Sequence, residues 1–241
     1  MNAAADFALW VYLSRTPLLW LTVTLAAYAL TETVSNSLGR HPLANPVLHA
    51  IWIIALILAL TGTPYATYFE GAQFVHFLLG PATVALAIPL YEHRHTAIKA
   101  LLPMAAALVV GGAAAIVTAI LVGAALGLPH AVLVALAPKS VTAAVAMGIT
   151  KTLGGDPSLT AVLVIITGIT GAIMVTPLMN ALRIKDWRAR GFASGLSAHG
   201  IGTARAFHVN PVAGTFAGIA MALTALLTAL LVPAAIGLLL R

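Results

Sequence analysis

Leu136-Ala137-Pro138-Lys139-Ser140-Val141-Thr142 is the stretch that decides the fold of this 241-residue chain. It places a proline, a full positive charge and two hydroxyls inside an otherwise apolar region. An ionisable side chain in hydrocarbon costs roughly 2.5–3.5 kcal/mol on insertion scales, so it normally persists only beside a cavity or a partner. Proline frees backbone groups that protein or water must then satisfy. The stretch therefore predicts a broken helix that lines a site for something small and negatively charged.

The composition indicates an integral membrane protein. Hydrophobic residues make up 61% of the chain, charged residues only 7%, and the mean hydropathy is +1.03. A spanning helix takes about 20 apolar residues, and several stretches reach that length. The period-2 alternation of a membrane barrel is absent from the sequence. We expect an all-α polytopic protein of the cytoplasmic (inner) membrane, a single transmembrane domain over residues 1–241, with about six to eight transmembrane segments.

Charge and motif content exclude several other classes. The net charge is +6, but the basic residues cluster in short loops, which is the positive-inside pattern of membrane proteins rather than a nucleic-acid footprint. There are no cysteines, and the eight histidines show no metal-ligand spacing. The sequence contains no nucleophile elbow and no nucleotide-binding motif. We therefore expect no enzyme activity, no cofactor and no metal.

An internal repeat surrounds the opening stretch. Residues 79–88 and 136–145 share the pattern Leu-x-Pro-x-(Thr/Ser)-Val-x-x-Ala-(Ile/Val). Each copy is followed by a turn and a long apolar helix, which gives candidate repeat units over 65–126 and 130–183. Two proline-broken hydrophobic segments in corresponding places are a pointer to the binding site of a transporter.

The charged loops bear on how the second copy sits in the membrane. The loops Glu92–Lys99 and Arg183–Arg190 are both expected to be cytoplasmic. A full crossing by residues 131–151 would put them on opposite sides, whereas a re-entrant hairpin keeps them on the same side. We favour the re-entrant hairpin, with the two repeats inverted as in an elevator-like secondary transporter. A broken crossing helix remains the alternative.

Lys139 and its neighbours are the first candidate substrate site. An ammonium, the hydroxyls of Ser140 and Thr142, and free amides at a half-helix N-terminus would together capture an anion. The alternative is that Lys139 snorkels from a helix end to the lipid headgroups. Against that alternative, the lysine follows a proline directly and lies far from any basic cluster.

A glycine-rich segment, residues 194–205, is the second candidate. It holds His199, Thr203 and Arg205 in one apolar stretch, and four-residue spacing puts His199 and Thr203 on one helix face. His199 is the residue we expect to carry proton coupling, while Arg205 is either a coupling group or an interfacial anchor. Four weaker candidates remain. Asn45 and Thr83 could line the site, and the membrane-adjacent acids Glu32 and Glu70 could pair with Lys139 or act in coupling.

Four stretches resemble the LrgB/CidB family of membrane proteins: residues 79–91, 137–142, 154–161 and 189–205. The Pro-Lys-Ser-Val-Thr and His-x-(Ile/Leu)-Gly-Thr-Ala-Arg motifs are specific to that family, and the likeness extends from about Pro42 to Pro233. One departure is Phe207-His208-Val209-Asn210-Pro211, where family members commonly carry acidic residues. The resemblance carries the family's motif positions onto Pro138, Lys139, Ser140, Thr142, His199, Gly202, Thr203 and Arg205.

The resemblance implies two functional hypotheses. Plastid members are glycolate/glycerate translocators and some bacterial members are linked to pyruvate movement, so the first is a secondary transporter of C2–C3 monocarboxylates or 2-hydroxy acids. Other bacterial members are named as antiholin-like regulators of murein hydrolase export and cell lysis, which is the alternative. The partners to consider are a small organic anion, the lipid bilayer, a second copy in a homodimer and a small LrgA/CidA-type membrane subunit.

Overall fold

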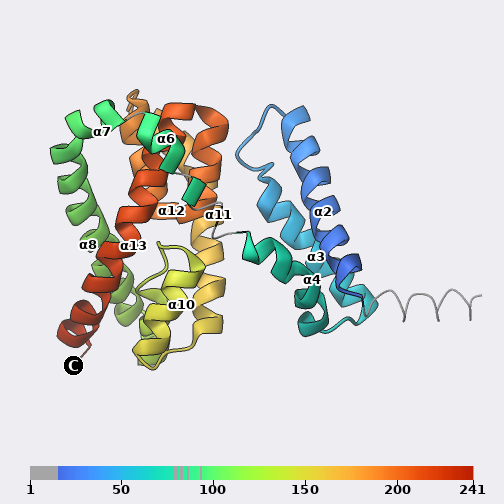
Figure 1. The fold of residues 1–241 in the computed structure, drawn as a ribbon. Coiled ribbons are helices and arrows are strands. Elements are labelled where there is room, and N and C mark those ends of the chain that lie inside the picture. Colours follow the sequence, from blue (N-terminus) through green and yellow to red (C-terminus); the bar gives the residue numbers. More distant parts are fainter. Residues whose placement is uncertain (1–15, 79–80, 82–83, 86, 93, 241) are drawn as a thin grey trace, which may run out of the picture. The chain divides into compact units, whose positions relative to one another are not determined.

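The structure is a computed structural model that describes residues 16–78, 81, 84–85, 87–92 and 94–240. All regular elements in these residues are helices (Figure 1). Among them, four are long and apolar enough to cross a membrane: α2 (Pro17–Ser37), α8 (Leu101–Ala125), α11 (Pro157–Ala181) and α13 (Pro211–Leu239). A fifth apolar helix, α3 (Pro46–Thr61), is shorter. The expected all-helical membrane protein is confirmed, and the number of six to eight segments stays a prediction.

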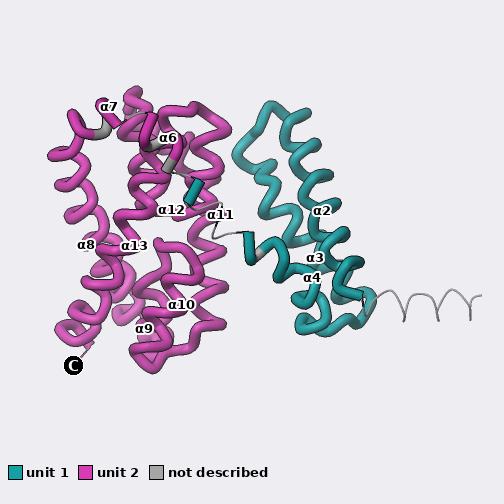
Figure 2. The backbone as a smooth tube through the Cα atoms, viewed as in Figure 1, with its two compact units in different colours: residues 1–87 teal, residues 88–241 magenta. Residues whose placement is uncertain are grey.

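The chain forms two compact units, residues 1–87 and 88–241 (Figure 2). The repeat unit predicted over 65–126 runs across this boundary, and half of the repeated motif at 79–88, including Thr83, lies outside the described residues. The single domain and that repeat pairing both stay predictions.

Unit 1 is built from α2, α3 and α4 (Tyr65–Phe77). The side chain of Trp20 is completely buried and meets Tyr68 edge-on, with the ring centroids 6.0 Å apart. Gly71 allows this approach, because a Cβ there would overlap the backbone of Pro17. The large aromatic side chain and the small residue thus fix α4 closely against α2.

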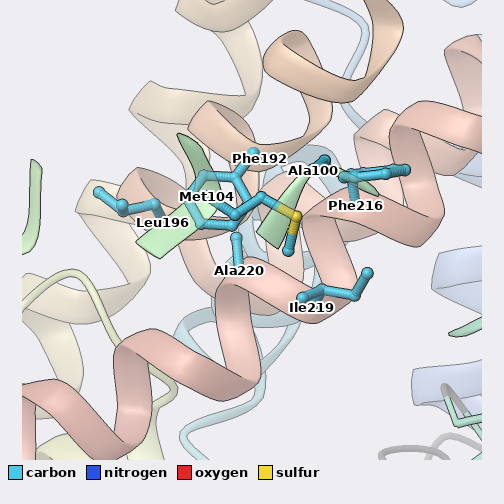
Figure 3. Close-up of a cluster of buried hydrophobic side chains, with 7 residues drawn as sticks. All are labelled: Ala100, Met104, Phe192, Leu196, Phe216, Ile219 and Ala220. Atoms are coloured by element: carbon cyan, nitrogen blue, oxygen red, sulfur yellow. The ribbon is translucent and has the colours of Figure 1, made fainter. Parts of the chain in front are cut away.

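Unit 2 contains the remaining helices: α6 (Ala87–Glu92), which starts at the boundary, α7 (Arg94–Lys99), α8, α9 (His130–Leu136), α10 (Ala143–Thr152), α11, α12 (Trp187–Val209) and α13. One part of its core joins the start of α8 to α12 and α13 and consists of Met104, Phe192, Leu196 and Phe216 with Ala100, Ile219 and Ala220 (Figure 3). Glycines let α12 lie directly on α13, since a Cβ at Gly195 would overlap the carbonyl group of Ala217.

A short helical hairpin replaces a spanning helix between α8 and α11. α9 and α10 are seven and ten residues long and are separated by the break at residues 137–142. The exit of α10 returns to α9, because a Cβ at Gly155 would lie 2.8 Å from a methyl group of Val134. Figure 1 shows α10 in the half of unit 2 that holds the C-terminus.

α12 is a second hairpin rather than one helix. Ala198 (φ −132°, ψ 20°) and His199 (φ 40°, ψ −135°) leave helical geometry, which separates limbs at 187–197 and 200–209. The limbs run antiparallel, because Ser194 Oγ donates a 2.9 Å hydrogen bond to the Gly202 carbonyl. Those residues would be about 12 Å apart along a straight helix. The sequence had suggested one apolar segment here, and the structure shows a reversal at its centre.

Each hairpin forms the N-terminal part of a longer segment, residues 130–181 for the first hairpin and residues 187–239 for the second. In each, a ten-residue second limb is followed by an Asx-Pro pair that starts a long helix: Asp156-Pro157 starts α11 and Asn210-Pro211 starts α13. The Asp and Asn side chains accept hydrogen bonds from the first turn of these helices, which is how N-caps stabilise a helix start. The two hairpins lie in opposite halves of unit 2 (Figure 1), and the inverted repeat expected from the sequence stays a prediction.

The two charged loops lie at one end of unit 2. A cavity of about 800 Å³ is lined by Lys99 from one loop and by Asp186 and Arg188 from the other, with mainly apolar side chains between them. The sequence predicted that both loops share a side. The structure brings Lys99, Asp186 and Arg188 of the two loops to one cavity, and the re-entrant course of the α9–α10 hairpin stays a prediction.

Candidate functional site

The two hairpin tips meet at Val164, one-third of the way along α11. The Val164 side chain packs in a buried cluster with Val141 of the first tip. Its carbonyl oxygen lies 2.9 Å from Nε2 of His199 in the second tip. One residue of α11 therefore contacts both breaks, which the sequence had placed about 60 positions apart.

The first tip presents polar groups that have no partner among the described residues. Ser140 is buried, and Lys139 and Thr142 are half-buried. Thr142 occupies the N-cap position of α10 without a side-chain capping bond. None of these three side chains has a hydrogen bond or ion pair with any residue that the structure describes. The tip thus offers an ammonium, two hydroxyls and the open amides of a half-helix N-terminus to a ligand.

His199 is fixed by its backbone contact. The residue is 5% exposed, and Nε2 points at a carbonyl oxygen, which can only accept. Nε2 therefore carries the proton, and Nδ1 is the nitrogen left for a ligand. Gly168 makes room for the ring, because a Cβ there would lie within 2.6 Å of His199 Nε2.

Two other motif residues hold the second turn. Thr203 Oγ1 donates to the His199 carbonyl at 2.8 Å, and the Gly202 carbonyl receives the bond from Ser194. A Cβ at Gly202 would lie 2.7 Å from the Ser194 carbonyl oxygen, so only glycine permits this approach. These contacts are structural, and substrate contacts by Gly202 and Thr203 stay predictions.

Arg205 lies between the limbs of the second hairpin, away from the tip. It lines a small cavity of about 20 Å³ together with Trp187, Arg190 and Ser194. Arg190 itself lies over the Trp187 ring at 4.8 Å and donates to Asn180 Oδ1 at 2.7 Å. The cavity has room for about one water molecule. Lys139 is not among its lining residues, so the structure does not bring Arg205 and Lys139 together in this cavity.

Two of the three described unit 1 candidates, Asn45 and Glu32, have local side-chain partners. Asn45 caps α3, with Oδ1 accepting from the amides of Val47 and Leu48. Glu32 pairs with Arg40 at 3.0 Å, and Glu70 is exposed on α4. Coupling roles for these acids, and a lining role for Asn45, stay predictions.

Sequence reasoning missed the α11 residues that contact the two hairpin tips. The contact surface on α11, called the α11 seat, consists of Val164, Gly168 and Gly171. A Cβ at Gly171 would overlap the Cβ of Ala198. A glycine pair spaced by three inside a long apolar helix is the signal that was available, because such glycines permit close packing.

Comparison with known proteins identifies the family. The model of the LrgB-like family matches residues 24–238, nearly the whole chain. The chain belongs to the LrgB-like family. This confirms the resemblance that the Pro138–Thr142 and His199–Arg205 motifs had indicated.

Relatives within this family carry two kinds of name. The chain is 34% identical to the "Uncharacterized protein YxaC" of Bacillus subtilis (strain 168), with 77% of this chain and 81% of the relative aligned. It is 30% identical to the "Holin-like protein CidB" of Staphylococcus epidermidis (strain ATCC 12228 / FDA PCI 1200), with 89% and 93% aligned. The corresponding "Holin-like protein CidB" of Staphylococcus aureus (strain N315) is also 30% identical, over 90% and 94%. No solved structure matches the chain.

Proposed function

We propose that this protein is a secondary transporter of small C2–C3 monocarboxylates or 2-hydroxy acids, of the glycolate, glycerate or pyruvate type. The observation that carries the proposal is the convergence of two helix breaks on Val164, beside unused polar groups of Lys139 and Ser140. Broken helices near the midplane, with half-helix N-termini aimed at an anion, are the usual binding device of secondary transporters.

In this proposal both hairpins are re-entrant and enter from opposite faces of the inner membrane. The carboxylate binds at the N-terminus of α10, where the helix dipole and Lys139 favour negative charge. Nδ1 of His199 faces the same ligand and is the coupling candidate. Unit 2 would carry the site in an elevator-like movement. No covalent step is needed, so the protein acts without enzyme chemistry or a cofactor.

Uptake of labelled glycolate, glycerate and pyruvate into proteoliposomes tests the transport proposal. Lys139→Ala should raise the KM about 10- to 100-fold, because hydrogen bonds to charged groups contribute about 1.5–3 kcal/mol. Lys151→Ala is the matched control, since Lys151 is exposed at the far end of α10. Normal affinity in Lys139→Ala would remove this residue from the site.

A second candidate function is a holin-like role in murein hydrolase export and lysis, in assembly with a small LrgA/CidA-type membrane partner. The relatives named "Holin-like protein CidB" support it, and those names favour it more directly than they favour transport. It predicts unselective leakage of solutes such as calcein that depends on oligomer formation. Saturable, competable uptake without calcein leakage would decide for the transporter.

A further inference from the structure

One face of α13 spans the interval between the two hairpin tips. Met221 contacts the second tip, with Sδ 3.9 Å from Thr203 Oγ1. Val232 packs with Ala137 of the first break and Ile149 of α10. Between these contacts, at helical spacings of three and four residues, α13 carries Thr224 and Thr228.

Both threonines are buried, and neither hydroxyl has a partner within the described part of the chain. Thr224 is 2% exposed and Thr228 is 3% exposed. A threonine in a helix commonly donates to the carbonyl four residues earlier, and Thr215 on the same helix does so to Pro211 at 3.0 Å. Thr224 and Thr228 make no hydrogen bond to any part of the chain that the structure describes, and Thr224 Oγ1 is shielded from solvent.

A packing role would not require hydroxyls at these positions. Valine has nearly the shape of threonine, and a buried hydroxyl without a partner lowers stability. Destabilising residues of this kind are retained at functional sites, where stability is traded for activity. Met221 at the second hairpin and Val232 at the first break flank the two hydroxyls on this face of α13, which puts the hydroxyls in the interval between the two hairpins that form the proposed anion site.

We propose that Thr224 and Thr228 bind the 2-hydroxy or 2-oxo oxygen of the substrate, and so select substituted acids over plain carboxylates such as acetate. This inference rests on the proposed transport function. The carboxylate is held at the α10 N-terminus, and the second oxygen receives hydrogen bonds from α13. A site built around hydroxyl partners rejects analogues that lack the oxygen, because its own polar groups are then left unpaired.

The test is a selectivity measurement in proteoliposomes. Uptake of labelled glycolate by the wild type and by Thr224→Val, Thr228→Val and Thr215→Val is competed with unlabelled glycolate and with acetate. The preference for glycolate over acetate should fall at least tenfold in the first two variants. It should persist in Thr224→Ser, which keeps the hydroxyl, and in Thr215→Val, whose hydroxyl bonds within the helix.

A stability measurement without ligand separates binding from packing. Thr224→Val should melt at or above the wild-type temperature in detergent, because it removes an unpaired hydroxyl, and glycolate should then raise its melting temperature less than it raises that of the wild type. An unchanged glycolate preference, or equal stabilisation of both proteins by glycolate, overturns this inference alone. Absence of saturable uptake by the wild type overturns the proposed transport function, and this inference with it.

Discussion

Replacement of Gly168 by alanine tests whether the second hairpin is seated as the structure shows. The added Cβ would lie 2.5 Å from Cε1 and 2.6 Å from Nε2 of His199. The ring has little room to move, because His199 is 5% exposed and its backbone lies in the turn. We expect the imidazole to shift away from α11 and to lose its 2.9 Å hydrogen bond to the Val164 carbonyl.

The net cost follows from three contributions. Overpacking of a buried site costs about 1–3 kcal/mol, and the lost hydrogen bond costs about 1 kcal/mol. Alanine in a helix gains about 1 kcal/mol over glycine. The variant should therefore be less stable by about 1–3 kcal/mol, and at roughly 2–4 °C per kcal/mol its melting temperature should fall by several degrees.

The assay is thermal unfolding of the purified protein in detergent, with Gly148→Ala as the matched control. Gly148 lies in α10, and a Cβ there meets nothing within 4 Å, so the control should be neutral or slightly more stable. A double-mutant cycle localises the effect: in a His199→Ala background, Gly168→Ala should cost little. Equal melting temperatures for Gly168→Ala and Gly148→Ala would refute the seating of the histidine.

Three further predictions concern stability. Gly195→Ala should unfold well below the wild-type temperature in the same assay, because the Cβ meets the backbone of Ala217 rather than a movable side chain; wild-type melting would contradict the close α12–α13 packing. Trp20→Ala should destabilise unit 1 by about 3–5 kcal/mol, measurable as faster proteolysis within residues 16–78, and unchanged proteolysis would speak against the buried ring. A hydrogen bond from the Arg188 side chain lowers the pKa of Asp186. The carboxylate therefore stabilises the fold above its ordinary pKa, and this contribution disappears as the pH falls through the folded pKa. Asp186→Asn should lose that part of the acid dependence in melting curves between pH 7 and pH 3, and unchanged curves would count against the Asp186–Arg188 contact.

The first tip was predictable because its signal is local. Pro138 removes a backbone donor and Lys139 is expensive in hydrocarbon, so the break and its polarity follow from single residues. The long apolar helices are equally local, and α8, α11 and α13 appear close to where hydropathy places them.

The second tip was missed because no proline marks it. Its turn is made by His199 at a positive φ of 40° and by contacts of Gly202 and Ser194 eight residues apart. Non-glycine residues seldom adopt such a φ, so the sequence predicted one apolar segment with His199 and Thr203 on the same helix face. Thr224 and Thr228 were also missed, since buried threonines are ordinary in helices and their lack of partners is visible only in three dimensions.

In the proposed transport function, the two hairpins give unlike sequences a common way to bind an anion. In both hairpins the second limb begins at the tip, so the open amides of two half-helix N-termini lie toward the region around Val164. Each contributes partial positive charge from its backbone whatever its side chains are. In that proposal the side chains differ in task, with Lys139 supplying full charge and His199 a nitrogen for proton coupling. The transport proposal therefore assigns anion binding mainly to the first hairpin and anion release to a change of protonation in the second.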